Sequence, residues 1–446
     1  MRPPRGIRRD LRLSLGDAAG YGAMAGVAEV YLPAFALALG MPPVLAGLVA
    51  TAPLLAGGLL QLLAPRAIAR VTSLRAWVIG CMIVQALSFV PLIIVALIGG
   101  PATPTVFASA ALYWAAGMGA SAGWNPWMAR VVPERIRGKF FGRRQGLAQA
   151  TMLAGLIGAG LALHAAAGTS HLLEIYAAMF AVAFVGRLAS ALMVSKMGRG
   201  IELTPRRRMR LRSIPEKLRG TPRASLLTYL LVAMAAGSIS GAFITPYLLD
   251  HQGLGYVHYS VFTATIVVSK IVFLPALGRL IQRVGVRRVL ASCAIAIAVI
   301  PLMYIASGNF IWLLMIQLYG GIAWGGFELG MLMALFDADD DAERTTLQVA
   351  FSALQAIGTA GASFIGAALL ASLGSGNEAY FWVFVASAIA RTLAAALIVR
   401  ELPRVLVRLP GVIVVRAWTL AIRPWGGTIV RPIVEGLGKL GRRDRD

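Results

Sequence analysis

Residues 174–187 read EIYAAMFAVAFVGR, and residues 378–391 read EAYFWVFVASAIAR. Each stretch begins with a glutamate, has a tyrosine two residues later and ends with an arginine, and the residues between are almost all apolar. Further matches occur in the same order along the chain, namely Cys81 with Cys293, Pro91 with Pro301, and Glu134 with Glu343. One match could arise by chance, but several in one order indicate a duplicated unit. The fold of one copy therefore predicts the fold of the other.

Each copy contains apolar runs that are long enough to cross a bilayer. Only 14% of the residues are charged and 58% are apolar, whereas soluble domains contain about 25% charged residues. A helix needs about 20 mostly apolar residues to cross the hydrocarbon core. Such runs fall near residues 14–39, 44–64, 76–98, 105–129, 146–168, 172–195, 225–249, 256–281, 289–307, 309–335, 347–373 and 379–399. We therefore expect an all-α membrane protein with twelve transmembrane helices, arranged as two pseudo-symmetric six-helix bundles.

The basic residues predict the orientation of these spans. If the N-terminus is cytoplasmic, 39 of the 42 Lys and Arg residues fall in cytoplasmic loops and termini, and the other three lie inside predicted spans. This distribution follows the positive-inside rule. It predicts a multi-pass protein of the cell inner membrane with both termini in the cytoplasm. Topology accounts for the net charge of +23, so we expect no nucleic-acid partner.

The predicted spans divide the chain into five parts. We expect a cytoplasmic N-terminus at residues 1–13, a first bundle at 14–195, a cytoplasmic linker at 196–224, a second bundle at 225–401 and a tail at 402–446. The tail is basic and amphipathic, and its longest apolar stretch is too short to span. We expect it to bind the anionic lipids of the inner leaflet, and we expect a monomer.

The loop after the eighth predicted span carries a family motif. Residues 278–288 read GRLIQRVGVRR, which resembles the Gly-x-Leu-x-Asp-Arg-x-Gly-x-Arg-Arg loop of the major facilitator superfamily. The resemblance implies the two-bundle fold of that family, transport by alternating access, and a gating loop formed here by Gly278, Arg283, Gly285 and Arg287. The acidic residue of the motif is replaced by Gln282. The alternative interpretation is that these arginines only anchor the loop at the cytoplasmic face.

Three ionisable side chains lie deep inside predicted spans, where each costs about 2.5–3.5 kcal/mol on insertion scales. They are Glu29, Lys270 and Glu328. The family places their spans at or beside the central cavity. Burial favours the protonated carboxyl, so Glu29 or Glu328 could carry a coupling proton, while Lys270 could bind an anionic group of the substrate. The alternative is a structural ion pair between Lys270 and one of the glutamates.

Other polar and aromatic residues of the spans are further candidates for functional or structural roles. Asn125 and Trp324 are candidates for contact with a substrate, although Trp324 also fits simple packing. Pro126 is expected to kink or end the fourth span, and Trp127 to anchor it at the membrane interface. Asp17 follows Ser14 in a pattern typical of a capping box at a helix start.

The repeated arginines, Arg187 and Arg391, are expected to be scaffold residues. We predict that their side chains extend toward the cytoplasmic face of the membrane.

The sequence leaves three functions open. The first is a secondary transporter of a small or amphipathic solute, with protons as a candidate coupling ion. The second is a lipid or glycolipid translocator of the same fold, and the third is a polytopic protein that transports nothing. We expect no enzyme, cofactor or metal site, because the histidines and cysteines lack suitable neighbours. Cys81 and Cys293 are predicted to be free, buried thiols.

Overall fold

The computed structural model describes residues 5–400, apart from residues 69, 72, 101, 199–221, 337–340 and 375. Every regular element in these ranges is helical. The predicted tail at 402–446 and most of the predicted linker lie outside the described residues. The predictions about those segments therefore stay predictions.

The helices of the first half are α1 (Arg5–Val27), η1 (Glu29–Tyr31), α2 (Leu32–Ala38), α3 (Pro43–Val49), α4 (Leu54–Ile68), α5 (Leu74–Leu87), α6 (Phe89–Ile98), α7 (Thr103–Val131), α8 (Glu134–Ala166) and α9 (Leu172–Ser195). The helices of the second half are α11 (Pro222–Gly241), α12 (Ile244–Pro246), η2 (Tyr247–His251), α13 (Tyr256–Val284), α14 (Val286–Ala306), α15 (Phe310–Phe336), α16 (Asp341–Ser372) and α17 (Asn377–Arg400).

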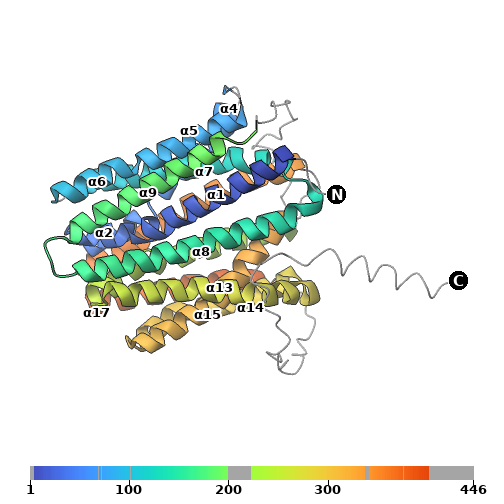
Figure 1. The fold of residues 1–446 in the computed structure, drawn as a ribbon. Coiled ribbons are helices and arrows are strands. Elements are labelled where there is room, and N and C mark those ends of the chain that lie inside the picture. Colours follow the sequence, from blue (N-terminus) through green and yellow to red (C-terminus); the bar gives the residue numbers. More distant parts are fainter. Residues whose placement is uncertain are drawn as a thin grey trace, which may run out of the picture.

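The long helices lie side by side, as Figure 1 shows for α1, α8 and α9 in the first half and for α13 and α15 in the second. Within the first half, α1 packs against α8 and α9, and α7 packs against α4 and α5. Within the second half, α11 packs against α16 and α17, and α14 packs against α15 and α17. The two halves meet along α8 with α13, and along α3 and α4 with α16.

Eleven of the described helical segments are long and apolar enough to cross a membrane. Helix α7, at the position of the predicted fourth span, is 29 residues long, which is sufficient to cross a bilayer. Its many small residues and its tryptophans lower its hydropathy, so it is not among the eleven. The chain is thus an all-helical, multi-pass membrane protein.

The repeated tyrosine and the aromatic residue four positions later lie inside the core in both halves. Tyr176 and Phe180 are fully buried in the first half, as are Tyr380 and Phe384 in the second. Helical spacing of four residues puts each pair on one face, and in the first half this face packs against Phe35. The repeat therefore marks the face of α9 and α17 that points into each half.

Both cysteines are free and buried, as predicted.

Candidate functional site

The first predicted span is not one continuous helix. Helix α1 ends at Val27, and a 3₁₀ turn at Glu29–Tyr31 connects it to α2. The break has a local cause, because Pro33 has no N–H to donate to the Glu29 carbonyl. That carbonyl instead accepts the N–H of Leu32, one residue earlier than an α-helix would provide. A break at this depth is tolerated where neighbouring protein or a cavity satisfies the freed backbone groups.

The seventh predicted span is interrupted in the same way. Helix α11 ends at Gly241, and the chain continues through the short α12 into the π-helical turn η2. Here Pro246 cannot donate to the Ala242 carbonyl, and the N–H of Phe243 binds the Ser240 carbonyl in a tighter turn. Pro33 and Pro246 are 213 residues apart, close to the separation of the other repeated pairs. The two halves are therefore broken at equivalent places.

Glu29 lies at the first of these breaks. The hydroxyl of Tyr113, from α7, donates a hydrogen bond of 2.5 Å to Glu29 Oε2. Tyr113 is itself buried. No Lys or Arg among the described residues lies within ion-pair distance of this carboxylate. Glu29 is thus an acid inside the membrane whose side-chain partner is neutral.

Lys270 and Glu328 form an ion pair between α13 and α15. Lys270 Nζ donates to Glu328 Oε1 at 2.6 Å, with side chains 31% and 47% exposed. Glu328 follows Trp324 by one helical turn, so the two share a face of α15. The Trp324 ring lies against Gly237 of α11, the helix that leads to the break in the seventh span. Of the two glutamates predicted as partners of Lys270, the structure selects Glu328.

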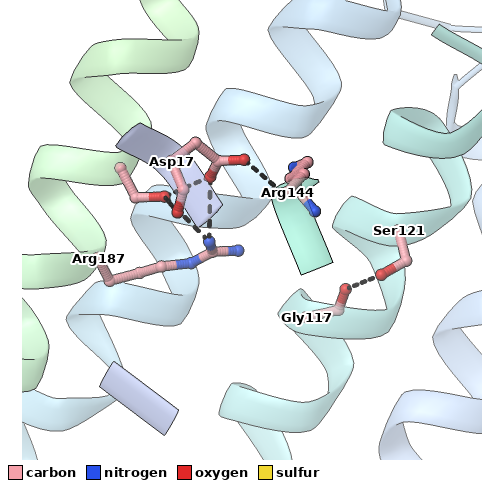
Figure 2. A network of polar contacts seen from close by, with 6 residues as sticks. Asp17, Gly117, Ser121, Arg144 and Arg187 are labelled. Carbon is pink, nitrogen blue, oxygen red and sulfur yellow. Dashed lines mark hydrogen bonds and ion pairs between the residues drawn. The ribbon is translucent and has the colours of Figure 1, made fainter. Parts of the chain in front are cut away.

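Asp17 does not cap a helix. Helix α1 begins at Arg5, so the capping prediction is wrong, and Asp17 lies in the middle of the helix with 2% of its surface exposed. Figure 2 shows its partners. Arg144 of α8 donates to Asp17 Oδ2 at 2.7 Å, Arg187 of α9 lies 3.9 Å from Oδ1, and Ser190 donates to the same oxygen. Residues 5–13, which we expected to be a cytoplasmic N-terminus, form the first turns of α1, and the helix therefore begins before the predicted start of the span.

Two arginines of the first half do not lie where the sequence predicts. Arg144 was expected in a cytoplasmic loop, but it lies inside α8 with its guanidinium 4.1 Å from the centre of the Trp124 ring. Arg187 is only 5% exposed, so it does not extend toward the membrane surface. The carboxylate of Asp17 holds both cations inside the first half. The prediction that the Arg187 side chain extends toward the cytoplasmic face is therefore wrong.

Arg391 is the counterpart of Arg187 in the second half, and it is 6% exposed. Its guanidinium donates to the carbonyl of Gly237 at 3.0 Å, to the carbonyl of Ile297 at 3.2 Å and to the hydroxyl of Ser240 at 3.2 Å. It also lies 5.8 Å from the centre of the Trp324 ring. No carboxylate among the described residues contacts it, and it does not extend to the surface either.

The residues of the predicted gating loop lie where α13 turns into α14. Gly285 ends α13 with a φ of 89°, a backbone conformation that favours glycine, and it turns the chain directly into α14. Arg283 on one side of this turn is exposed and Arg287 on the other is half-buried, while Gly278 lies within α13. The gating role of this loop stays a prediction.

The end of α7 differs from the prediction. The helix continues through Pro126 to Val131, so Pro126 does not end it. Trp127 is 1% exposed and packs in a core cluster with Met128 and Val132, so it is not an interfacial anchor. The side chain of Asn125 lies outside the described part of the chain. In the segments that the structure describes, no group of His, Cys, Asp and Glu could hold a metal ion.

Contacts between the halves gather near the breaks. The hydroxyl of Tyr31 contacts that of Ser260 at 2.6 Å, and the hydroxyl of Tyr259 donates to the carbonyl of Val30 at 3.2 Å. Thr51 donates to Ser363 at 2.8 Å across the other line of contact. We call these three contacts the outer seam, after the orientation that the basic residues predict. A Cβ atom at Gly160 of α8 would lie 2.8 Å from the Tyr31 hydroxyl, so α8 also approaches closely here.

The fold is similar to those of solved transporters. A mutant of the nucleoside transporter NupG superposes with a TM-score of 0.70 at 13% identity, over 89% of this chain and 100% of that chain. A POT family transporter in complex with 5-aminolevulinic acid gives 0.63 at 13% identity, over 90% and 97%. A bacterial homologue of the iron transporter ferroportin gives 0.66 in its inward-facing state at 15% identity, over 90% and 99%. In its outward-facing state it gives 0.58 at 16% identity, over 89% and 99%.

Sequence comparison adds the family. Residues 225–434 match the sequence profile of the Major Facilitator Superfamily. A comparison with curated proteins finds no match. The all-helical fold is thus similar to that of solved membrane transporters over about nine-tenths of the chain. The second half of the chain thus carries the sequence pattern of this superfamily.

Proposed function

We propose that the chain is a secondary transporter that moves a small or amphipathic solute across the cell inner membrane by alternating access. The observation that carries this proposal is the interruption of α1–α2 and α11–α12 at equivalent places. In transporters built from repeats, discontinuous helices in corresponding positions of the two halves mark the substrate site. Here Glu29 lies at one break, and Trp324 packs against the helix that leads to the other.

The proposal includes twelve spans in two six-helix bundles. Eleven candidate spans and the 29-residue α7 supply the number, and the packing within each half supports the grouping. Both termini are then cytoplasmic, because the basic residues lie on that side. Two bundles that meet along α8–α13 and α3–α4–α16 can rock around a central site.

In the proposed scheme the structure is an inward-facing state. The outer seam is closed by Tyr31 with Ser260, by Tyr259 with Val30, and by Thr51 with Ser363. The higher TM-score with the inward-facing ferroportin homologue than with its outward-facing state, 0.66 against 0.58, agrees with this assignment.

Glu29 is the proposed carrier of a coupling proton. Of the three acids placed deep in the described spans, Asp17 is held by arginines and Glu328 by Lys270, whereas Glu29 contacts only the Tyr113 hydroxyl. Protonating either of the first two would leave a cation without its partner, which is costly in a low-dielectric surrounding. Protonating Glu29 leaves no such cation.

Lys270 is the proposed contact for an anionic group of the solute. The side chains of the ion pair with Glu328 are 31% and 47% exposed, so a ligand can reach the ammonium. A carboxylate or phosphate of the solute could share the ammonium with Glu328. Trp324, one turn away on the same face, offers an apolar ring beside it.

Transport into proteoliposomes, with and without a pH gradient, tests these roles. The solute panel should include organic anions, neutral solutes and a fluorescent phospholipid, since a lipid translocator of the same fold would move only the last. We expect the Glu29→Gln variant to exchange the solute at equal pH but to lose accumulation driven by the gradient. Glu174→Gln, which changes an exposed acid at the end of α9, is the matched control and should behave as the parent.

Two outcomes would overturn the assigned roles. If Glu29→Gln and Glu328→Gln both leave transport fully driven by the gradient, neither acid carries the proton. If Lys270→Ala retains the affinity for an anionic solute, Lys270 does not bind its charge.

A further inference from the structure

An apolar groove of 340 Å³ opens on the side of the molecule where the two halves meet. Its walls come from α8 of the first half and α13 of the second, and α15 contributes a single side chain. The side chains that line its mouth are Ile157, Leu161, Val261, Val268, Val272 and Leu318, all of them at least 40% exposed. In a membrane-spanning helix such positions face hydrocarbon rather than water.

The lining of the groove offers a ligand no free hydrogen-bond donor. Its three hydroxyls already donate to backbone carbonyls, Ser260 to Tyr256, Thr265 to Val261, and Ser269 to Leu318 across to α15. A bound group with hydrogen-bond acceptors would therefore lose hydrogen bonds to water or lipid headgroups on entering. The lining suits an apolar occupant.

The length of the groove fits a chain that lies along the helices. Val257 and Phe273, its outermost lining residues on α13, are sixteen residues apart, which is about 24 Å along a helix. Half of a bilayer core is about 15 Å thick. A single extended acyl chain that enters from the outer leaflet therefore fits within the groove while its headgroup stays at the interface.

We propose that this groove binds the acyl chain of a membrane lipid, and that the bound chain favours the state with the outer seam closed. The second part follows from the walls, because α8 and α13 belong to different halves. They are held together at Gly160, where an added Cβ would lie 2.7 Å from Ser260 Cβ. If the halves separate at this point, the groove loses its shape, so the chain binds one state better than the other. This second part rests on the proposed alternating access, whereas the binding site itself does not.

The other line of contact between the halves is packed more closely. There the backbone of Gly58 in α4 lies against Ala356 of α16, so that an added Cβ would be 2.8 Å from the Ala356 Cβ, and Thr51 binds Ser363. Side chains beside this contact, such as Ile357, are as exposed to lipid as those of the groove. This line therefore provides an internal control for ordinary contact with the bilayer.

Photolabelling of the full chain in nanodiscs tests the site. The probe is a phosphatidylcholine with a photoactivatable diazirine in the middle of one acyl chain, and labelled peptides are mapped by mass spectrometry. We expect label on residues 257–273 and 157–161 to exceed that on the exposed face of α16 several-fold. Unlabelled phospholipid should reduce this excess, because a defined site saturates and general contact does not.

Variants at positions of similar exposure test whether the label comes from lipid in the groove. Val268→Trp fills the groove, and Ile357→Trp adds the same bulk at an equally exposed position beside the other line of contact, at 46% and 47% exposure. We expect Val268→Trp to lower the label on residues 157–161 to the level of α16, and Ile357→Trp to leave it unchanged. Leu161→Trp, on the opposite wall, should lower the label on residues 257–273 and serves as a second variant if Val268→Trp folds poorly.

The proposal is overturned if all lipid-facing helices are labelled equally, or if the groove variants and the Ile357 variant behave alike. The coupling to the closed seam is tested separately with Gly160→Ala, which should lower the groove label, against Gly158→Ala, whose Cβ would meet no atom within 4 Å. If the groove label persists in Gly160→Ala, the lipid binds but does not favour the closed seam. Neither result depends on knowing the transported solute.

Discussion

The same arginine is buried in both halves, but its surroundings differ. In the first half, Arg187 lies beside the carboxylate of Asp17, which also holds Arg144. In the second half, Arg391 is held by the carbonyls of Gly237 and Ile297 and by a serine hydroxyl. One site is a network of full charges, and the other is a cation held by neutral dipoles.

The difference shows what the duplication has kept. Both copies kept the position of the arginine, thirteen residues after the glutamate, and both bury it against the helix that begins each half. The counter-charge was not kept, since no acid of the described second half contacts Arg391. A buried charge loses its hydration at a cost of several kcal/mol, and the two halves recover that loss by different means. Changes at the two sites should therefore have different effects.

The largest effect is expected from the removal of the charge of Asp17. The Asp17→Asn variant keeps the size of the side chain but leaves Arg144 and Arg187 without a carboxylate. Removing one partner of a buried pair costs about 3–5 kcal/mol. The free energy of unfolding in detergent micelles should fall by that amount. Asp250→Asn, at an exposed position, is the control, and an equally small loss in both variants would show that the network contributes little.

A smaller loss is expected from Arg187→Met. Asp17 still has Arg144 at 2.7 Å in this variant, so the carboxylate stays paired and only the weaker contacts of Arg187 disappear. Hydrogen bonds to charged groups are worth about 1.5–3 kcal/mol, and the 3.9 Å separation from Asp17 puts the loss at or below the lower limit. The same unfolding measurement checks this value. A loss as large as that of Asp17→Asn would show that Arg187, and not Arg144, is the main partner of Asp17.

The smallest effect is expected from Arg391→Met. The carbonyl of Gly237 lies within α11, where a helical bond also serves it. Only the carbonyl of Ile297, whose helical donor would be Pro301, loses its hydrogen bond when Arg391 is replaced. The substitution removes a buried cation and leaves no buried anion behind, and apolar replacements of buried charges are often neutral or stabilising. The change in the free energy of unfolding should stay within about 1 kcal/mol. A loss above that of Arg187→Met would mean that the neutral dipoles hold Arg391 more strongly than Asp17 holds Arg187.

Sequence reasoning predicted the positions of these arginines but not their partners. The fold class, most of the spans and the duplication follow from apolar runs and repeated residues, because a span needs only length and apolarity. The partner of a side chain depends on how each helix is rotated and at what depth it meets the next. Asp17 shows the difficulty, since Ser14 and Asp17 fit a helix start, and only the continuation of α1 back to Arg5 places Asp17 inside the bundle.

The interruptions of the first and seventh spans have a signal in the sequence that apolar runs do not contain. Pro33 and Pro246 occupy equivalent places, and a proline within an apolar run predicts an interruption. The pairing of Glu29 with Tyr113, by contrast, joins residues 84 positions apart, and no spacing rule predicts it. The choice between Glu29 and Glu328 as the partner of Lys270 likewise needed the packing of α13 against α15.

We propose that the two halves move as bodies and close at the outer seam. Distances between spin labels at Glu174 and Glu378, exposed residues at equivalent ends of α9 and α17, test it without a known solute. We predict that Gly160→Ala, which crowds Ser260 and Tyr31, shifts the distribution toward longer distances, whereas Gly158→Ala leaves it unchanged. Labels at His164 and Glu174, both in the first half, should keep one distance throughout. A single Glu174–Glu378 distance that is the same in the parent and both variants would contradict the account.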